Sequence, residues 1–240
     1  MRIPPTLATA AMLLLASSAL LAQQPAEKAQ PKKAEPDPAF AKVEDKPGLP
    51  RVLLIGDSIS IGYTVDVQKL LAGKANVHRI PVNGGPTTNG LENLKKWLGD
   101  SKWDVIHFNW GLHDLKYVVR GSTIVDVTTV GAHRQISLED YEKNLRELVK
   151  TLKATGAKLI WCSTTPVPAG AKGRTTGDEV KYNEAAARVM KDAGIPTNDL
   201  YEHAKAKLEA IQNKADVHFK PAGSKYLAEQ VAAEIEKTLK

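Results

Sequence analysis

Apolar residues occur along this chain in short unbroken runs, separated by longer stretches with helical periodicity. The runs are rich in β-branched and aromatic residues, which is typical of strands buried on both faces. Strands that alternate with helices form a parallel sheet with helices on both faces, so the pattern predicts an α/β fold with five strands. The runs lie at residues 52–55, 77–82, 103–110, 157–162 and 195–200.

Helices are expected between the runs, and two of them carry clear start signals. Ser137 and Asp140 form a Ser-x-x-acid cap in front of residues 138–153. Pro221 suits the first turn of a closing helix that ends near residue 237. Further helices are expected from the end of the first strand to about residue 72 and at residues 89–98, 178–193 and 201–212.

Two segments interrupt the alternation of strands and helices. Residues 115–135 contain Gly121, Gly131 and a β-favouring run, and they predict an inserted loop or hairpin. Residues 163–177 form a loop rich in Pro, Gly and Thr that contains Arg174. Loops of that length in a compact domain are usually functional or disordered, so both segments are candidates for substrate contact.

The first fifty residues differ from the rest in composition. Residues 1–22 combine Arg2 with an apolar stretch and end in small residues, which predicts a secretory signal peptide. The apolar stretch is shorter than the ~20 residues of a membrane span, so we expect a periplasmic or secreted protein without stable membrane insertion after cleavage. Residues 23–50 are rich in Pro, Lys, Ala and Glu and predict a disordered or extended spacer, which leaves residues 51–240 as the folded domain.

Charge and cysteine content narrow the class of protein further. Residues 51–240 hold 27 basic and 22 acidic residues, dispersed along the sequence without interleaved aromatic residues. This pattern argues against nucleic-acid binding. The single cysteine, Cys162, cannot form an internal disulfide, and its apolar neighbours predict a small buried side chain.

The first apolar run ends in Gly56-Asp57-Ser58, where a helix is expected to begin. Short oxygen-bearing side chains suit the free N–H groups of a first helical turn. The same position lies at the carboxyl edge of a parallel sheet, where open α/β folds bind their ligands. From this segment alone, Ser58 is either a helix cap or a nucleophile.

Three further loops are expected at the same edge of the sheet. They are Asn83-Gly84-Gly85-Pro86-Thr87, Gly111-Leu112-His113-Asp114 and Asp216-Val217-His218. Together with the Gly-Asp-Ser segment, these blocks resemble in order and spacing the four motif blocks of the SGNH, or GDSL-type, hydrolase family. The resemblance spans residues 51–240. It implies a three-layer, flavodoxin-like α/β/α sandwich and a serine esterase that acts without metal or cofactor.

The resemblance also implies a role for each residue. Ser58 would attack an ester carbonyl while His218 takes its proton, and Asp216 would orient His218. The negative oxygen of the tetrahedral intermediate would be held by the backbone N–H groups of Ser58 and Gly85 and by a side chain of the third block, His113.

Two positions depart from the usual motif. The third block usually has an asparagine where this chain has His113; an imidazole also donates a hydrogen bond, with a strength that depends on pH. The acid of the final block usually lies three residues before the histidine, where this chain has Ala215. Asp216 therefore orients His218 by a different loop path, or a backbone carbonyl does so and the site is a Ser-His dyad.

The expected partner is a small-molecule or carbohydrate acyl ester, and the resemblance makes O-acetyl groups on carbohydrate the leading candidate. Arg174 is the candidate substrate-binding residue. The alternatives are a non-catalytic carbohydrate-binding protein on the same fold and a lipase or thioesterase. A metal site formed by His113 and Asp114 with His107 or His133 is disfavoured, because no metal-ligand spacing is met.

Overall fold

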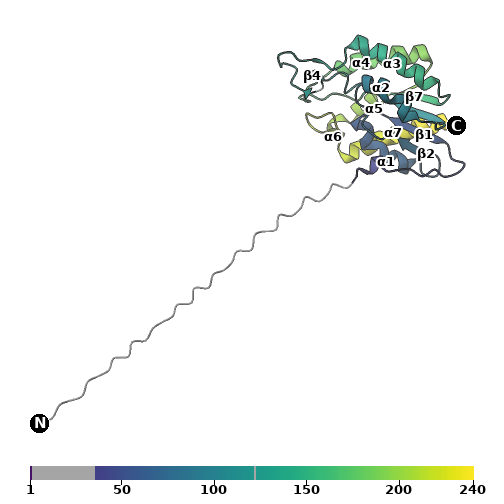
Figure 1. Cartoon of the computed structure of the whole chain (residues 1–240), viewed down its shortest axis with the longest axis horizontal. Coiled ribbons are helices and arrows are strands. Elements are labelled where there is room, and N and C mark those ends of the chain that lie inside the picture. The colour runs from purple at the N-terminus through teal and green to yellow at the C-terminus, as the bar shows by residue number, and fades with distance from the viewer. Residues whose placement is uncertain (2–35, 122) are drawn as a thin grey trace. The chain divides into compact units, whose positions relative to one another are not determined.

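A five-stranded parallel sheet organises the protein in the computed structural model, which describes Met1 and residues 36–121 and 123–240 (Figure 1). The strand order β2-β1-β3-β7-β8 is the flavodoxin-like order. All neighbouring strands pair in parallel, which confirms the predicted class of fold. The strands are β1 (Arg51–Ile55), β2 (Asn76–Arg79), β3 (Val105–Phe108), β7 (Lys158–Cys162) and β8 (Thr197–Asn198).

Helices cover both faces of this sheet and complete the three predicted layers. Figure 1 shows α3 and α4 on one side of the sheet and α1 and α7 on the other. The helix α2 packs against α3, α3 packs against α4, and α1 packs against α7. The long helices are α1 (Ser58–Leu70), α2 (Thr87–Leu98), α3 (Leu138–Lys153), α4 (Asp178–Ala193) and α7 (Pro221–Leu239).

The predicted start signals act as expected. The hydroxyl of Ser137 accepts the Asp140 N–H at 3.0 Å and donates to the Asp140 carboxylate at 2.7 Å, so α3 begins at the predicted residue. Helix α7 begins at Pro221, whose missing N–H costs nothing in a first turn.

Most other predicted elements shift by one or two residues at an end, and three differ more. Strand β2 stops at Arg79: the N–H of Ile80 still donates to the Leu54 carbonyl, but the next carbonyl, that of Gly56, accepts the N–H of Gly84 rather than that of Val82. The predicted strand at 195–200 is reduced to the two residues of β8. The N–H of Ile195 donates to the Met190 carbonyl at the end of α4, and the next helix begins at Leu200. The single helix expected at 201–212 is two short helices, α5 (Leu200–Lys205) and α6 (Leu208–Ile211), separated by a turn.

The interior of the sandwich is apolar and aromatic. The four residues after Arg51 in β1 are all buried, and the ring of Phe108 lies 5.3 Å from Trp161 and 6.2 Å from Trp110. Cys162 is buried in this core as predicted, and burial raises the pKa of its thiol. The sheet is therefore a rigid platform for the loops at its carboxyl edge.

The inserted segment is a small antiparallel sheet rather than an irregular loop. Its strands are β4 (Tyr117–Val119), β5 (Thr123–Ile124) and β6 (His133–Arg134), in the order β5-β4-β6. The N–H of Tyr117 donates to the carbonyl of Gly173 at 2.7 Å. This bond attaches the insertion to the long loop that contains Arg174.

The predicted disordered spacer at 23–50 needs a correction in its second half. Residues 36–50 pack onto the domain and include a short 3-10 helix, η1 (Pro38–Phe40), in which Ala39 is only 2% exposed. The carboxamide of Asn76 accepts the Lys46 N–H at 2.9 Å and donates to the Lys46 and Leu49 carbonyls. Backbone hydrogen bonding, which composition does not report, therefore orders this segment.

The predicted signal peptide and the first part of the spacer, up to residue 35, fall outside the described residues. Among the described residues, no helix has the length and hydrophobicity that crossing a bilayer requires.

Candidate active site

Ser58 is the first residue of α1 and follows the carboxyl end of β1, which lies between β2 and β3 in the sheet. Asp57 is the helix cap: it is 2% exposed, and its carboxylate accepts the N–H of Ile59 at 2.9 Å. Gly56 allows the tight turn, because a Cβ there would lie 2.9 Å from Ser60. The cap is thus supplied by the neighbouring residue, and the hydroxyl of Ser58 is left for another partner.

That partner is His218, which lies 160 residues further along the chain. The Oγ of Ser58 lies 2.8 Å from Nε2 of His218. On the other side of the ring, Nδ1 lies 2.7 Å from Oδ1 of Asp216. With the proton on Nδ1, the imidazole donates to Asp216 and accepts from the Ser58 hydroxyl, which is the arrangement of a Ser-His-Asp triad.

Asp216 reaches the imidazole although it lies only two residues before His218. Ala215 adopts the left-handed conformation, with φ of 54°, and so turns the chain sharply just before Asp216. The loop is closed by the N–H of Asn213, which donates to the His218 carbonyl at 3.0 Å. It is anchored by Gln212, whose Nε2 donates to the carbonyls of Val217 and Pro166. The structure thus contains the different loop path that the shortened spacing requires.

The environment keeps Asp216 ionised. Partial burial raises the pKa of this carboxyl, but hydrogen bonds from the ring and backbone N–H of His218 outweigh it and hold the pKa below its usual value. The backbone N–H of His218 lies 3.2 Å from the same carboxylate oxygen. An ionised carboxylate on Nδ1 favours the tautomer in which Nε2 accepts a proton.

His113 lies in the loop after β3 and is half-buried. Burial lowers the pKa of its imidazole, the cations Lys116 and Arg174 add to this effect, and Asp57 opposes it. The ring is therefore neutral near pH 7 and has one N–H to donate. Gly111 makes the turn possible, since a Cβ there would meet the Thr164 side chain at 2.1 Å.

The N–H of Gly85 is already hydrogen-bonded. Gly85 has φ of +61°, a conformation that favours glycine, and its N–H donates to Oδ1 of Asn83 at 2.9 Å. The predicted oxyanion donor thus has an acceptor within its own loop. Asn83 has no expected role of its own in the motif blocks, although an Asn two residues before a glycine is a common turn signal.

Asp114 joins the second and third motif loops. It is fully buried, and its Oδ1 accepts both the backbone N–H and the hydroxyl of Thr87, at 2.8 and 2.6 Å. Burial raises the pKa of the carboxyl to about 7, although the bonds from Thr87 act in the opposite direction. Asp114 therefore holds the start of α2 beside the loop of His113.

The other two histidines of the metal-site alternative lie elsewhere. His107 is buried in β3, where its Nε2 faces the Nδ2 of Asn198 at 3.1 Å, and burial lowers its pKa to about 3. His133 is exposed in β6 of the insertion. Over residues 36–121 and 123–240, no group of three or more His, Cys, Asp and Glu side chains converges as metal ligands would.

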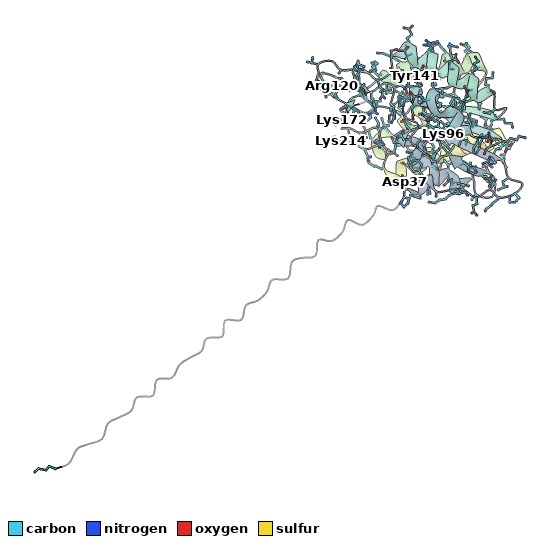
Figure 2. The ribbon with its side chains drawn as sticks, viewed as in Figure 1. Asp37, Lys96, Arg120, Tyr141, Lys172 and Lys214 are labelled. Carbon is cyan, nitrogen blue, oxygen red and sulfur yellow. The ribbon has the colours of Figure 1, made fainter. Side chains whose placement is uncertain are left out.

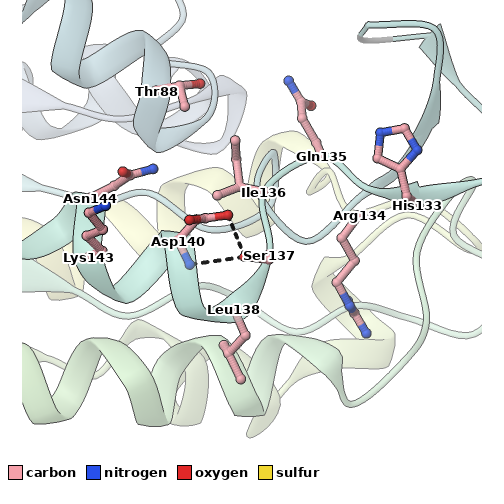
Figure 3. Close-up of a pocket in the computed structure, with 10 residues that line it drawn as sticks. All are labelled: Thr88, His133, Arg134, Gln135, Ile136, Ser137, Leu138, Asp140, Lys143 and Asn144. Carbon is pink, nitrogen blue, oxygen red and sulfur yellow. Dashed lines mark hydrogen bonds between the residues drawn. The ribbon is translucent and has the colours of Figure 1, made fainter.

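The structure also has a surface hollow of about 720 Å³, whose lining residues are drawn in Figure 3. The insertion and the start of α3 form most of its wall, and none of the triad residues lines it. A second cavity holds about 10 Å³ and lies beneath the start of α1. Its walls include Ile59 and Ser60, the two residues after Ser58, and Leu112, the residue before His113.

Comparison with protein families gives one match. The profile of the GDSL-like lipase/acylhydrolase family matches residues 54–226, which include the first three motif loops and His218. The comparison with curated proteins finds no match.

Several solved structures share the fold at low sequence identity. A lipase/acylhydrolase from Enterococcus faecalis is 19% identical, with a TM-score of 0.65 over 79% of this chain and 96% of that one. The acetyl xylan esterase AlAXEase is 15% identical, with a TM-score of 0.62 over 77% of this chain and 99% of that one. The acetylxylan esterase Axe2 from Geobacillus stearothermophilus is 16% identical, with a TM-score of 0.61 over 78% and 94%.

Proposed function

Because the chain belongs to the GDSL-like lipase/acylhydrolase family, we propose that it hydrolyses short acyl esters with Ser58 as nucleophile, His218 as base and Asp216 as the residue that orients the base. Membership of this family makes the protein a hydrolase of ester bonds. The observation that carries the assignment of residues is the chain of two hydrogen bonds, 2.8 Å from Ser58 to His218 and 2.7 Å from His218 to Asp216.

In this mechanism Oγ of Ser58 attacks the ester carbonyl while Nε2 of His218 takes the hydroxyl proton. The tetrahedral intermediate collapses as the imidazolium returns the proton to the leaving alcohol, which leaves an acyl group on Ser58. Water then attacks the acyl-enzyme with the same base, and the acid and free Ser58 are released. Asp216 stabilises the imidazolium in both steps.

The negative oxygen of the intermediate needs donors, each worth about 3 kcal/mol of barrier. The N–H of Ser58, at the positive end of α1, is the first of them. The neutral imidazole of His113 is the second. The N–H of Gly85 becomes the third when the oxyanion replaces the side chain of Asn83 as its acceptor.

The choice of a short acyl group is supported by two of the structural neighbours. Two structural neighbours are acetyl xylan esterases by name, which supports O-acetyl groups on carbohydrate as the substrate. The signal-like start of the sequence supports export to the periplasm or the medium.

The test is hydrolysis of p-nitrophenyl acetate, butyrate and octanoate by the wild type and by Ser58→Ala. We expect the acetate to be the best substrate and Ser58→Ala to lower kcat by at least about 10³-fold. Ser101→Ala, in an exposed loop, is the matched control and should keep full activity. Equal rates for wild type and Ser58→Ala would favour the non-catalytic carbohydrate-binding protein, and a preference for octanoate would favour a lipase.

A further inference from the structure

The basic residues in excess within the domain are concentrated in three segments that carry or adjoin the catalytic loops. These segments are the insertion (115–135), the long loop (163–177) and the His218 loop (212–220). They hold seven Lys or Arg residues and two Asp residues, whereas the rest of residues 51–240 has 20 basic and 20 acidic residues. The charge that looks dispersed along the sequence is therefore concentrated in the fold. The basic residues are Lys116, Arg120, Arg134, Lys172, Arg174, Lys214 and Lys220.

Direct contacts hold the three segments together. The insertion donates to the long loop through the N–H of Tyr117, which bonds the Gly173 carbonyl at 2.7 Å. The long loop meets the His218 loop where Gln212 donates to the Pro166 carbonyl at 2.9 Å. These contacts join the three segments, and we call their cations, apart from Arg134, which is paired with Asp178, the basic rim.

Arg174 is the innermost cation of the basic rim. Its Nε donates to the Leu112 carbonyl at 3.0 Å, directly before His113, and its Nη1 donates to the Lys172 carbonyl. The guanidinium is half-buried, and burial lowers its pKa while the nearby Asp57 and Asp216 oppose the shift. An arginine keeps its charge under these conditions.

No carboxylate is paired with Arg174 in the part of the chain that the structure describes. By contrast, salt bridges to carboxylates are formed there by Arg51, Arg134, Arg146 and Arg188. A partly desolvated guanidinium is stabilised by a carboxylate that reaches it, because charged hydrogen bonds of this kind are strong and directional. Arg174 thus offers a binding position for an anion close to His113.

Lys116 lies next to this position. It directly precedes Tyr117, whose N–H is bonded to the residue before Arg174, so the two cations stand on joined segments. Lys116 is half-buried, burial and then the charge of Arg174 lower its pKa, and the described residues provide it with no salt bridge. Gly173 fixes this junction, since a Cβ there would lie 2.5 Å from Ile124.

Further cations extend from this inner pair toward solvent. Figure 2 shows Arg120, Lys172 and Lys214 along the same side of the molecule, and all three are exposed. They come from the insertion, the long loop and the His218 loop, one from each segment. A ligand with repeated negative charges would meet them in addition to the inner pair.

We propose that the substrate is an ester on an acidic carbohydrate, with a carboxylate near the scissile bond bound by Arg174 and Lys116 and with further carboxylates along the polymer facing the outer cations of the basic rim. The inference rests on the proposed esterase function and specifies its substrate. A polysaccharide that contains uronic acids and carries O-acetyl groups has this chemistry. An acetylated neutral xylan has the same ester without the charge.

The experiment compares O-acetylated polygalacturonate with O-acetylated xylan as substrates of the full chain. We expect kcat/KM for the acidic polymer to exceed that for xylan by at least tenfold at 20 mM NaCl and the preference to shrink at 200 mM NaCl. Equal values for the two polymers at low salt overturn the proposal. Hydrolysis of p-nitrophenyl acetate is measured in parallel. If this neutral ester is not hydrolysed, the proposed esterase function is rejected, whereas its hydrolysis without a preference for the acidic polymer rejects only the proposed substrate.

Variants separate charge recognition from a structural role. Lys116→Gln and Arg174→Gln should each reduce the ratio of kcat/KM between the acidic polymer and xylan by about tenfold, mainly through KM. Arg174→Lys should restore part of the ratio, because it keeps the charge. Lys96→Gln, an exposed cation of α2 outside the basic rim, is the matched control and should leave the ratio unchanged. A ratio that stays constant in both Gln variants, even with lower activity on both polymers, overturns the proposal.

Discussion

His113 stands where the family motif usually has an asparagine, and the structure shows why an imidazole suits the position. The ring is half-buried between cations, and the resulting low pKa keeps it neutral, so it resembles an amide as a hydrogen-bond donor. We therefore expect His113→Asn to keep kcat on p-nitrophenyl acetate within tenfold at pH 7. Its activity should also vary less than that of the wild type at acidic pH, because an amide does not titrate.

The matched change at this position is His113→Leu, which fills similar space without a donor. We expect it to lower kcat by about 10²-fold to 10³-fold with little change in KM, as the loss of one oxyanion donor does. Full activity in His113→Leu would show that the imidazole does not hold the oxyanion.

Asn83 leads to a second prediction at the scale of single residues. Its Oδ1 lies 2.9 Å from the N–H of Gly85, so Asn83→Asp would place a negative charge beside the oxyanion. Repulsion over this distance at a protein surface is worth about 1–3 kcal/mol, which corresponds to a loss in kcat of about 10-fold to 100-fold. Steady-state kinetics at pH 7 checks this, with Ser101→Asp, which adds the same charge in an exposed loop away from the motif loops, as control. An unchanged kcat in Asn83→Asp would remove Gly85 from the oxyanion hole.

Single residues also mark how far sequence reasoning extends. Ser58, His218 and Asp216 were selected from the motif blocks, and the structure brings them together. The bond from Gly85 to Asn83 was not foreseen, since it depends on which loop rotamer the fold selects. The sequence leaves open whether Asp216 reaches His218, because that contact depends on the left-handed backbone of Ala215, a conformation expected at glycine rather than at alanine.

At the scale of elements, long amphipathic helices were predictable and short edge elements were not. Helices α3 and α4 begin and end at the predicted residues, because caps and periodicity act locally. Strand β8 and the pair α5 and α6 differ from the prediction, since their lengths are set by neighbours that compete for the same backbone groups. Composition does not predict that residues 36–50 are ordered for a similar reason: the side chain that binds their backbone, Asn76, lies on another element.

This segment can be tested through Asn76. Its side chain makes three hydrogen bonds to the backbone of Lys46 and Leu49 and is 5% exposed. We expect Asn76→Ala to lower the free energy of unfolding by about 1–3 kcal/mol, because buried backbone groups lose their partners. Urea denaturation measures the change, with Lys96→Ala on the exposed face of α2 as control. A change below about 0.5 kcal/mol would show that residues 36–50 add nothing to stability.

At the scale of the whole molecule, the fold concentrates charge that the sequence distributes. Composition indicated a modest basic excess, and it argued against nucleic acid because no local stripe was present. The basic rim arises only when three segments far apart in sequence meet around His218. Pairing of that kind depends on tertiary contacts, and a pattern along one chain does not contain it.

The stability of the whole fold should also depend on pH through two buried groups that act in opposite directions. His107 has its pKa lowered from 6.5 to about 3, so the folded protein stays neutral there while the unfolded chain takes up a proton below pH 6.5. Stability is then lost as pH falls from 6.5 toward 3. Asp114 has its pKa raised from 3.8 to about 7, so the folded protein keeps a proton that the unfolded chain releases. Stability is then lost as pH rises from about 4 toward 7.

Each group changes the free energy of unfolding by at most about 1.4 kcal/mol per pH unit, so the two effects largely cancel between pH 4.5 and 6.5 in the wild type. In a variant that lacks one of the two groups, the pH dependence of stability due to the other can be measured. We expect Asp114→Asn, which keeps an acceptor for Thr87, to lose stability as pH falls over this range, and we expect His107→Gln to gain stability as pH falls. Urea denaturation at pH 4.5, 5.5 and 6.5 measures both slopes. Parallel profiles for the two variants would mean that neither buried group titrates with the shifted pKa, because only opposite shifts give slopes of opposite sign.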